Sequence, residues 1–251
     1  MRYCFSAAFL ASLILGVALQ SPCYGAVINE FFADDDGGDD AEFVELYGSP
    51  GESLSGLSFI VVDGDTSGNT TSSNFNRVTV QIDFTTESIP ADGFFVLGGG
   101  TTPNVDYSFG VNTLQNGSQT YALVRTADIA FDAEDDDELT EASVNAITAN
   151  LIDAVGSLDN GEGDLVYFGA PDISDGTGFA IDSAQRIPNG VDTDSAADWL
   201  TESTFPEKEL ADTAATPGTV NAAAIPEPSS ILMALMAASG VGAVAMRRRL
   251  G

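Results

Sequence analysis

The chain has 251 residues, with 38 acidic residues against eight basic ones and no histidine, so its formal net charge is −30 at pH 7. Without histidine, the Ser-His and Cys-His nucleophile arrangements of many hydrolases are excluded. A surface this acidic repels phosphate backbones, and we therefore expect no nucleic-acid partner.

A secretory signal peptide is predicted over residues 1–25. A basic residue precedes an apolar stretch from Phe5 to Leu19, and small residues at Cys23 and Gly25 suit cleavage before Ala26. Both cysteines of the chain leave with this segment. The mature chain then has no thiol, which also excludes zinc sites, and its fold must be stable without disulfides.

Residues 26–221 form the body, which we expect to be one all-β domain. Its apolar runs are short, rich in Val, Ile, Phe, Leu and Tyr, and separated by Gly, Asp, Asn and Ser, which is typical of a β-sandwich. The predicted strands are Ala26–Ala33, Glu42–Gly48, Leu57–Val62, Arg77–Phe84, Gly93–Leu97, Tyr121–Arg125, Leu151–Val155, Asp164–Phe168 and Ser183–Ile187. Only a helical turn or two is expected, around Leu139–Ala149 and Ser195–Leu200.

Acidic loops of the body supply candidate calcium ligands. The candidates are Asp34, Asp36 and Asp39 in one loop, and Asp63 and Asp65 in another. Calcium prefers six to eight oxygen ligands from closely spaced groups on flexible loops. The second loop has the spacing of the first half of an EF-hand, but Asn74 stands where that loop needs a glutamate. The alternative is that each cluster is simply a solvated acidic loop.

Several motifs of the body stand in a fixed order. They are Val27–Asp34, Glu42–Tyr47, Leu54–Phe59, Ala184–Asp194, Asp198-Trp199 and Thr216–Asn221. Together they resemble the lamin tail domain, an immunoglobulin-like sandwich also found in bacterial surface and secreted proteins. The resemblance implies an immunoglobulin-like β-sandwich acting as an interaction module, here with long acidic loops at Asp63–Asn76 and Asp128–Ile147. Within it, we expect Arg186 to pair with Asp198, and Trp199 to seal one end.

Residues 222–251 read as a linker followed by a sorting tail. The tail combines a break at Pro226, Glu227 and Pro228, an apolar segment at 231–246, and a cationic stop at Arg247, Arg248 and Arg249. As a helix, the apolar segment would rise about 24 Å, which is short of the ~30 Å hydrocarbon core of a bilayer. Three arginines favour the cytoplasmic side.

This tail resembles the PEP-CTERM sorting tail of exopolysaccharide-forming Gram-negative bacteria. In that family an exosortase, a membrane enzyme similar to transpeptidases, recognises the tail and cuts near Pro-Glu-Pro. The resemblance implies an exported protein held in the membrane by its C-terminal transmembrane helix in transit, then placed at the cell surface or in the extracellular matrix. An ordinary membrane anchor is the alternative.

These features leave three interpretations of function. The first is a non-catalytic surface or biofilm-matrix protein that binds exopolysaccharide, ions or surface proteins. The second is a calcium-stabilised adhesin, in which calcium is the candidate cofactor. The third is a polysaccharide hydrolase that uses paired carboxylates. We expect no enzyme, because acidic residues are so abundant here that a pair of them indicates nothing by itself.

Overall fold

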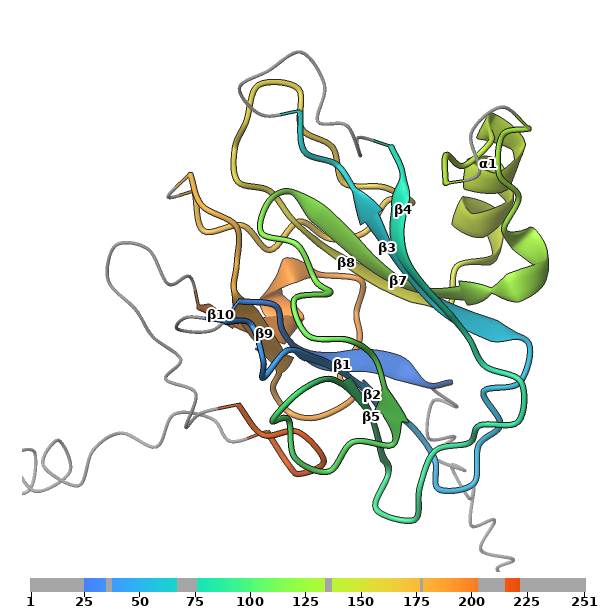
Figure 1. Cartoon of the computed structure of the whole chain (residues 1–251), viewed down its shortest axis with the longest axis vertical. Coiled ribbons are helices and arrows are strands. Elements are labelled where there is room, and N and C mark those ends of the chain that lie inside the picture. Colours follow the sequence, from blue (N-terminus) through green and yellow to red (C-terminus); the bar gives the residue numbers. More distant parts are fainter. Residues whose placement is uncertain are drawn as a thin grey trace, which may run out of the picture.

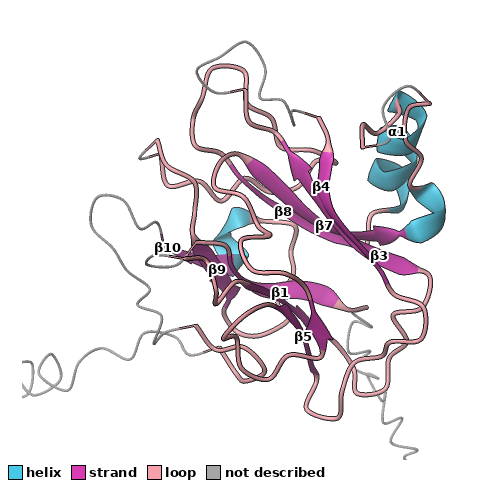
Figure 2. Ribbon diagram, in the orientation of Figure 1, coloured by secondary structure: helices cyan, strands magenta, loops and turns pink. Residues whose placement is uncertain are grey.

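The computed structural model describes residues 25–34, 38–66, 76–133, 137–176, 178–202 and 215–221. Two β-sheets pack face to face, and a ten-residue helix lies to one side of the smaller sheet (Figures 1 and 2). The predicted signal peptide up to residue 24 and the tail from residue 222 lie outside the described residues. The domain boundaries drawn at residues 25 and 221 therefore stay predictions.

The larger sheet has six strands in the order β10-β9-β1-β2-β5-β6. They are β1 (Val27–Phe32), β2 (Phe43–Tyr47), β5 (Phe94–Gly98), β6 (Tyr107–Ser108), β9 (Ser183–Arg186) and β10 (Trp199–Glu202). Every pairing is antiparallel except that of β5 with β6.

The smaller sheet is antiparallel, in the order β4-β3-β7-β8. Its strands are β3 (Leu57–Asp63), β4 (Val78–Asp83), β7 (Gln119–Arg125) and β8 (Asp153–Ser157). On the edge strand β4, buried Val78, Val80 and Ile82 alternate with more exposed residues. Val80 and Ile82 reach the core between the sheets, whereas Val78, beyond a register shift in the pairing with β3, joins the cluster on the outer face.

The core lies between the sheets. The ring of Phe31 on β1 stacks on that of Tyr121 on β7, with centroids 4.5 Å apart. A bulge between Ile28 and Glu30 interrupts the pairing of β1 with β2. Because a bulge shifts the side-chain alternation, Ile28 and Phe31 both reach the core. Trp199 belongs to the same cluster, and its role in sealing one end of the sandwich stays a prediction.

A second apolar cluster covers the outer face of the smaller sheet. The helix α1 (Glu141–Asn150) packs there through Ile147, which contacts a cluster including Ile60 and Val124. Its first turn is capped by Thr140, whose hydroxyl accepts a hydrogen bond from the Ser143 amide at 3.1 Å. The predicted helical turns at 139–149 are therefore a complete ten-residue helix.

The structure corrects two other predictions and adds a strand. Asp164–Phe168 is a loop, in which the Leu165 amide bonds to the Gly64 carbonyl and Phe168 has a φ of 60°. The short strand β6 was not predicted. The helical turns predicted at 195–200 are a 3-10 turn over Ala196–Asp198, and the chain then continues as β10.

Candidate functional site

The acidic loops converge at one end of the smaller sheet, where β3 and β8 finish. The segment that follows β8, yellow in Figure 1, lies beside the end of β3. Thr66, which follows β3, links the two segments: its amide and its hydroxyl donate hydrogen bonds to Asp164 Oδ1 at 2.8 and 2.7 Å. Asp65, Asp159 and Asp164 meet here, each with a carboxylate oxygen within 4.8 Å of the others.

The predicted calcium ligands are distributed unequally around this cluster. Asp65 belongs to it, and Asp63 accepts a hydrogen bond from the Asp65 amide at 2.8 Å. Asp34 lines an adjoining cavity of about 410 Å³, which Asp159 also lines. Asp39 lies apart, where its carbonyl accepts from the Asn112 amide. Asp36 falls outside the described residues.

Asp159 and Asp164 were not predicted as ligands. These two residues are the first and last of the segment Asp159-Asn160-Gly161-Glu162-Gly163-Asp164. The segment has the mixture of carboxylates and glycines found in calcium loops. That signal was present in the sequence, but the following Leu-Val-Tyr-Phe favoured a strand. Only the folded chain brings these two residues to Asp65.

The two carboxyl groups of Asp159 and Asp164 titrate differently. Burial and a hydrogen bond to Asp164 raise the pKa of Asp159. Burial also acts to raise the pKa of Asp164, but hydrogen bonds from Asp159, Ser118 and Thr66 outweigh it and hold that pKa well below its usual range. The hydrogen bond between the two carboxyl groups therefore favours ionisation of Asp164 over ionisation of Asp159.

These oxygens fit a hard cation. Ligands on opposite sides of a calcium ion lie about 4.6–5.2 Å apart, since each bond is 2.3–2.6 Å long. The spread of the three carboxylate oxygens falls within that limit. The hydroxyl groups of Thr66 and Ser118 contact the same carboxylates and add oxygen atoms nearby.

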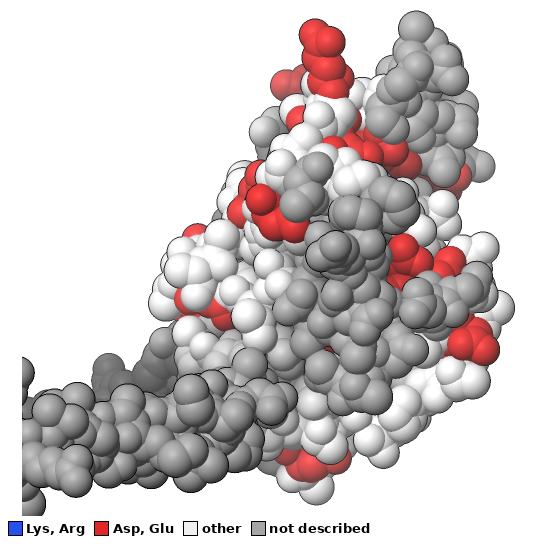
Figure 3. Space-filling model, turned by 90° about the vertical axis from the view of Figure 1, so that its left-hand side faces the viewer, with Lys and Arg blue, Asp and Glu red and all other residues white. Residues whose placement is uncertain are grey.

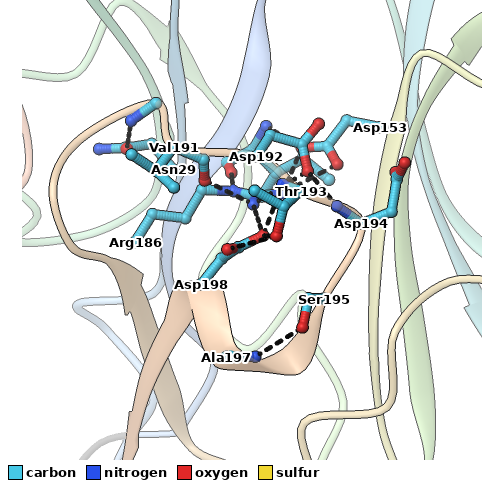
Figure 4. A network of polar contacts seen from close by, with 12 residues as sticks. Asn29, Asp153, Arg186, Val191, Asp192, Thr193, Asp194, Ser195, Ala197 and Asp198 are labelled. Carbon is cyan, nitrogen blue, oxygen red and sulfur yellow. Dashed lines mark hydrogen bonds and ion pairs between the residues drawn. The ribbon is translucent and has the colours of Figure 1, made fainter.

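A second polar cluster surrounds the buried Arg186 on β9 (Figure 4). Its guanidinium bonds to Asp153 at 2.9 Å, to Asp192 at 3.2 Å and, as expected, to Asp198 at 3.5 Å. It also stacks 4.4 Å from the centroid of the Trp199 ring. Burial raises the pKa of Asp153 to about 7, although the charge of Arg186 lowers it. The cluster ties β8 and β9 to the 191–198 loop and has the character of a structural clasp.

A third feature is the strap, residues 215–221, which crosses the outer face of the larger sheet. Glu30 accepts hydrogen bonds from the amide and hydroxyl of Thr216 at 2.9 and 2.8 Å. Glu45 accepts from the Gly218 amide at 2.6 Å. Desolvation by burial raises the pKa of Glu30 to about 7 and that of Glu45 to about 8.

The strap ends at Asn221, which is buried. Its side-chain amide donates to the carbonyls of Arg186 and Asn29 at 3.0 and 3.3 Å, and its backbone amide donates to Asn189 Oδ1 at 3.0 Å. The fold therefore holds the chain firmly up to the residue before the predicted linker.

The sorting residues Pro226, Glu227, Pro228, Arg247, Arg248 and Arg249 lie outside the described residues, as does the apolar segment at 231–246. Among the residues that the structure does describe, no helix has the length and apolar character needed to cross a membrane.

Comparison with known proteins identifies the tail. Residues 224–249 match the model of the PEP-CTERM protein-sorting motif. Neither the curated proteins nor the solved structures contain a match to the chain. The likeness of the body to lamin tail domains stays a prediction. The chain carries a PEP-CTERM protein-sorting motif, which implies export and a location at the cell surface or envelope.

Proposed function

We propose that this protein is a non-catalytic surface or exopolysaccharide-matrix protein, in which a sandwich similar to the lamin tail domain is the binding or structural module. The observation that carries the proposal is the sorting motif at residues 224–249. An exosortase-type enzyme is its processing partner, and the segment at 231–246 holds the chain in the membrane until it is processed.

The strap supports this arrangement. Asn221 is held by hydrogen bonds to the folded body, and Pro226 follows five residues later. At ~3.5 Å per residue, the start of the Pro-Glu-Pro cleavage region lies within about 18 Å of the body. A short tether of this kind presents a folded cargo close to the membrane surface.

Mass spectrometry of the mature C-terminus tests the sorting role. In producing cells we expect a terminus near Pro228, and in cells that lack the exosortase we expect the unprocessed chain ending at Gly251. Replacement of Pro226 and Pro228 by alanine should have the same effect as loss of the enzyme. An identical processed form in both strains would contradict the proposal.

Calcium stabilisation is a second candidate property, and the cluster of Asp65, Asp159 and Asp164 favours it. Three carboxylates on two loops would bind the ion, and the ion would fix one loop against the other. Calcium at 100 times its dissociation constant should add about 2.7 kcal/mol to the free energy of unfolding, which raises the melting temperature by roughly 5–10 °C.

Thermal unfolding with calcium, magnesium and a chelator measures this shift. The variant Asp164→Asn should lose it, whereas Asp194→Asn, the same change at an exposed acid of another loop, should keep it. An equal rise in melting temperature in both variants, or an equal rise with magnesium and with calcium, would indicate charge screening only.

We propose no catalytic activity. The mature body has neither histidine nor cysteine, and the buried carboxylates of Asp153, Glu30 and Glu45 bond within the clasp and to the strap. Incubation with exopolysaccharide should release no new reducing ends. Release that disappears in an Asp159→Asn variant would favour the hydrolase instead.

A further inference from the structure

The structure points to a socket for the amino terminus that export creates. The Ala26 amide donates a hydrogen bond to Glu52 Oε1 at 2.9 Å. Ala26 is the residue before which the signal peptide is predicted to be cut. We propose that Glu52 receives the new terminal ammonium group of the mature chain and holds it as an ion pair. This inference rests on the proposed export of the chain.

The surroundings of Ala26 are those of a fixed terminus. Its side chain is 1% exposed and belongs to the inter-sheet core, whereas Gly25 is exposed and lines a surface cavity. The boundary between buried and exposed chain therefore coincides with the predicted cut. A chain shortened further would lose a core residue, and in a longer one the Ala26 nitrogen that contacts Glu52 would remain an uncharged amide.

Glu52 is held in place independently of Ala26. Its other carboxylate oxygen accepts from the Ser49 amide at 3.1 Å, and its backbone bonds to both Ser49 and Ile89. Gly48 lets the segments approach: a Cβ there would lie 3.0 Å from Glu52 Oε2 and 3.3 Å from Ala26 Cα. The Glu52 carboxylate is thus held in place without the terminal amine. The contact therefore costs little conformational entropy of the Glu52 side chain.

Cleavage changes the chemistry of this contact. Hydrolysis by signal peptidase consumes one water, which leaves a carboxylate on Gly25 and an ammonium on Ala26. An amide donates one hydrogen bond and carries no charge, whereas the ammonium donates three and is positive below its usual pKa of about 8. Charge-assisted hydrogen bonds are roughly twice as strong as neutral ones. Since Ala26 is buried in the folded body, the cut must precede folding.

A four-way comparison of purified chains tests the socket. One form begins at Gly25 and the other at Ala26, and both end at Gly251. Both are kept in the same detergent. Each is made with Glu52 and with the substitution Glu52→Gln, which keeps the side-chain shape but removes the charge. With Glu52, the form that begins at Ala26 should melt about 2–4 °C higher. With Glu52→Gln, the difference should vanish.

The pKa of the terminal amine gives a direct readout. Lys208 is the only lysine, so the mature chain has only one other amine, and peptide mass spectrometry can follow the acetylation of each as pH is varied. Glu52→Gln should lower the terminal pKa by about half a unit or more. The control Glu141→Gln, an exposed acid of α1, should leave it unchanged.

Equal melting differences with and without Glu52, or an unaltered amine pKa, would overturn the socket. N-terminal sequencing of the exported protein checks its biological premise, and a terminus other than Ala26 would also overturn it. Either result is independent of tail processing, so failure here and failure of the sorting proposal can be told apart.

Discussion

At the scale of single residues, Arg186 combines burial with permanent charge. It is 1% exposed, and its guanidinium group carries a positive charge. Its Nε donates to the Ile28 carbonyl at 2.7 Å, and its Nη atoms bond to three carboxylates, one on β8 and two in the 191–198 loop. Removal of this cation would leave buried carboxylates without a counter-charge.

We therefore expect Arg186→Met to lower the free energy of unfolding by about 3–5 kcal/mol, the usual cost of removing one member of a buried ion pair. Urea denaturation measures the loss. The control Arg125→Met, at an exposed position on β7, should change stability by less than about 0.5 kcal/mol. Equal losses at the two sites would show that the clasp does not stabilise the fold.

Glu30 and Glu45 make stability depend on pH. Their folded pKa values of about 7 and 8 lie above the value of 4.5 for an unburied glutamate. A raised folded pKa means that the stabilising protonated form is complete below 4.5 and is lost as pH rises through 7 and 8. Between pH 5 and pH 8, each group should lower the free energy of unfolding by up to about 1.4 kcal/mol per pH unit.

Denaturation curves collected from pH 5 to pH 9 check this slope. The double substitution of Glu30 and Glu45 by glutamine should flatten the profile, because glutamine stays neutral throughout. Glu141→Gln should leave it as steep as in the parent chain. A profile that rises toward pH 9 would mean that the strap amides hold the ionised carboxylates more strongly than burial opposes them.

At the scale of elements, the strap shows how a segment without regular structure can be fixed. Asn221→Ala would leave the Arg186 and Asn29 carbonyls without their side-chain donor in a buried place. Such losses cost about 1–3 kcal/mol. The neighbouring Val220 is 70% exposed, so Val220→Ala should be nearly neutral.

Thermal unfolding and limited proteolysis of the two variants measure the effect. Asn221→Ala should open the strap and speed cleavage near residues 215–221, whereas Val220→Ala should resemble the parent. If both variants resist protease equally, the side chain of Asn221 does not hold the strap.

The order of apolar and polar residues predicted some strands well and others poorly. On β4, apolar and polar residues alternate, and this local pattern is enough to indicate a strand. Residues 164–168 have a similar apolar content, but Asp164 is bound by Thr66 and Ser118 in a loop. β10 depends on its pairing with β9, which a local pattern does not reveal.

At the scale of the whole molecule, charge repulsion is the dominant long-range effect. The body contains 37 of the 38 acidic residues but only four basic ones, Arg77, Arg125, Arg186 and Lys208, for a formal charge of −33. Acidic side chains are spread over the face in Figure 3 rather than gathered in one patch. Mutual repulsion of this kind opposes the compact state.

Raising sodium chloride from 10 mM to 1 M shortens the screening length from about 30 Å to about 3 Å. We expect the melting temperature to rise over this range by several degrees, with a chelator present to exclude bound calcium. Choline chloride should act similarly, since screening does not depend on the cation. A falling melting temperature would mean that attractive pairs such as those of Arg186 outweigh the repulsion.

The sequence by itself determined the export tail, the all-β class and most strand positions, because these depend on local order: apolar length, alternation and the spacing of Pro, Glu and Arg. Only the tertiary structure decided which acids meet. Asp65 and Asp159 are 94 residues apart, and Ala26 and Glu52 are brought together by a turn and a glycine. Contacts between distant segments depend on how sheets pack and loops close, and a local pattern carries no information about either.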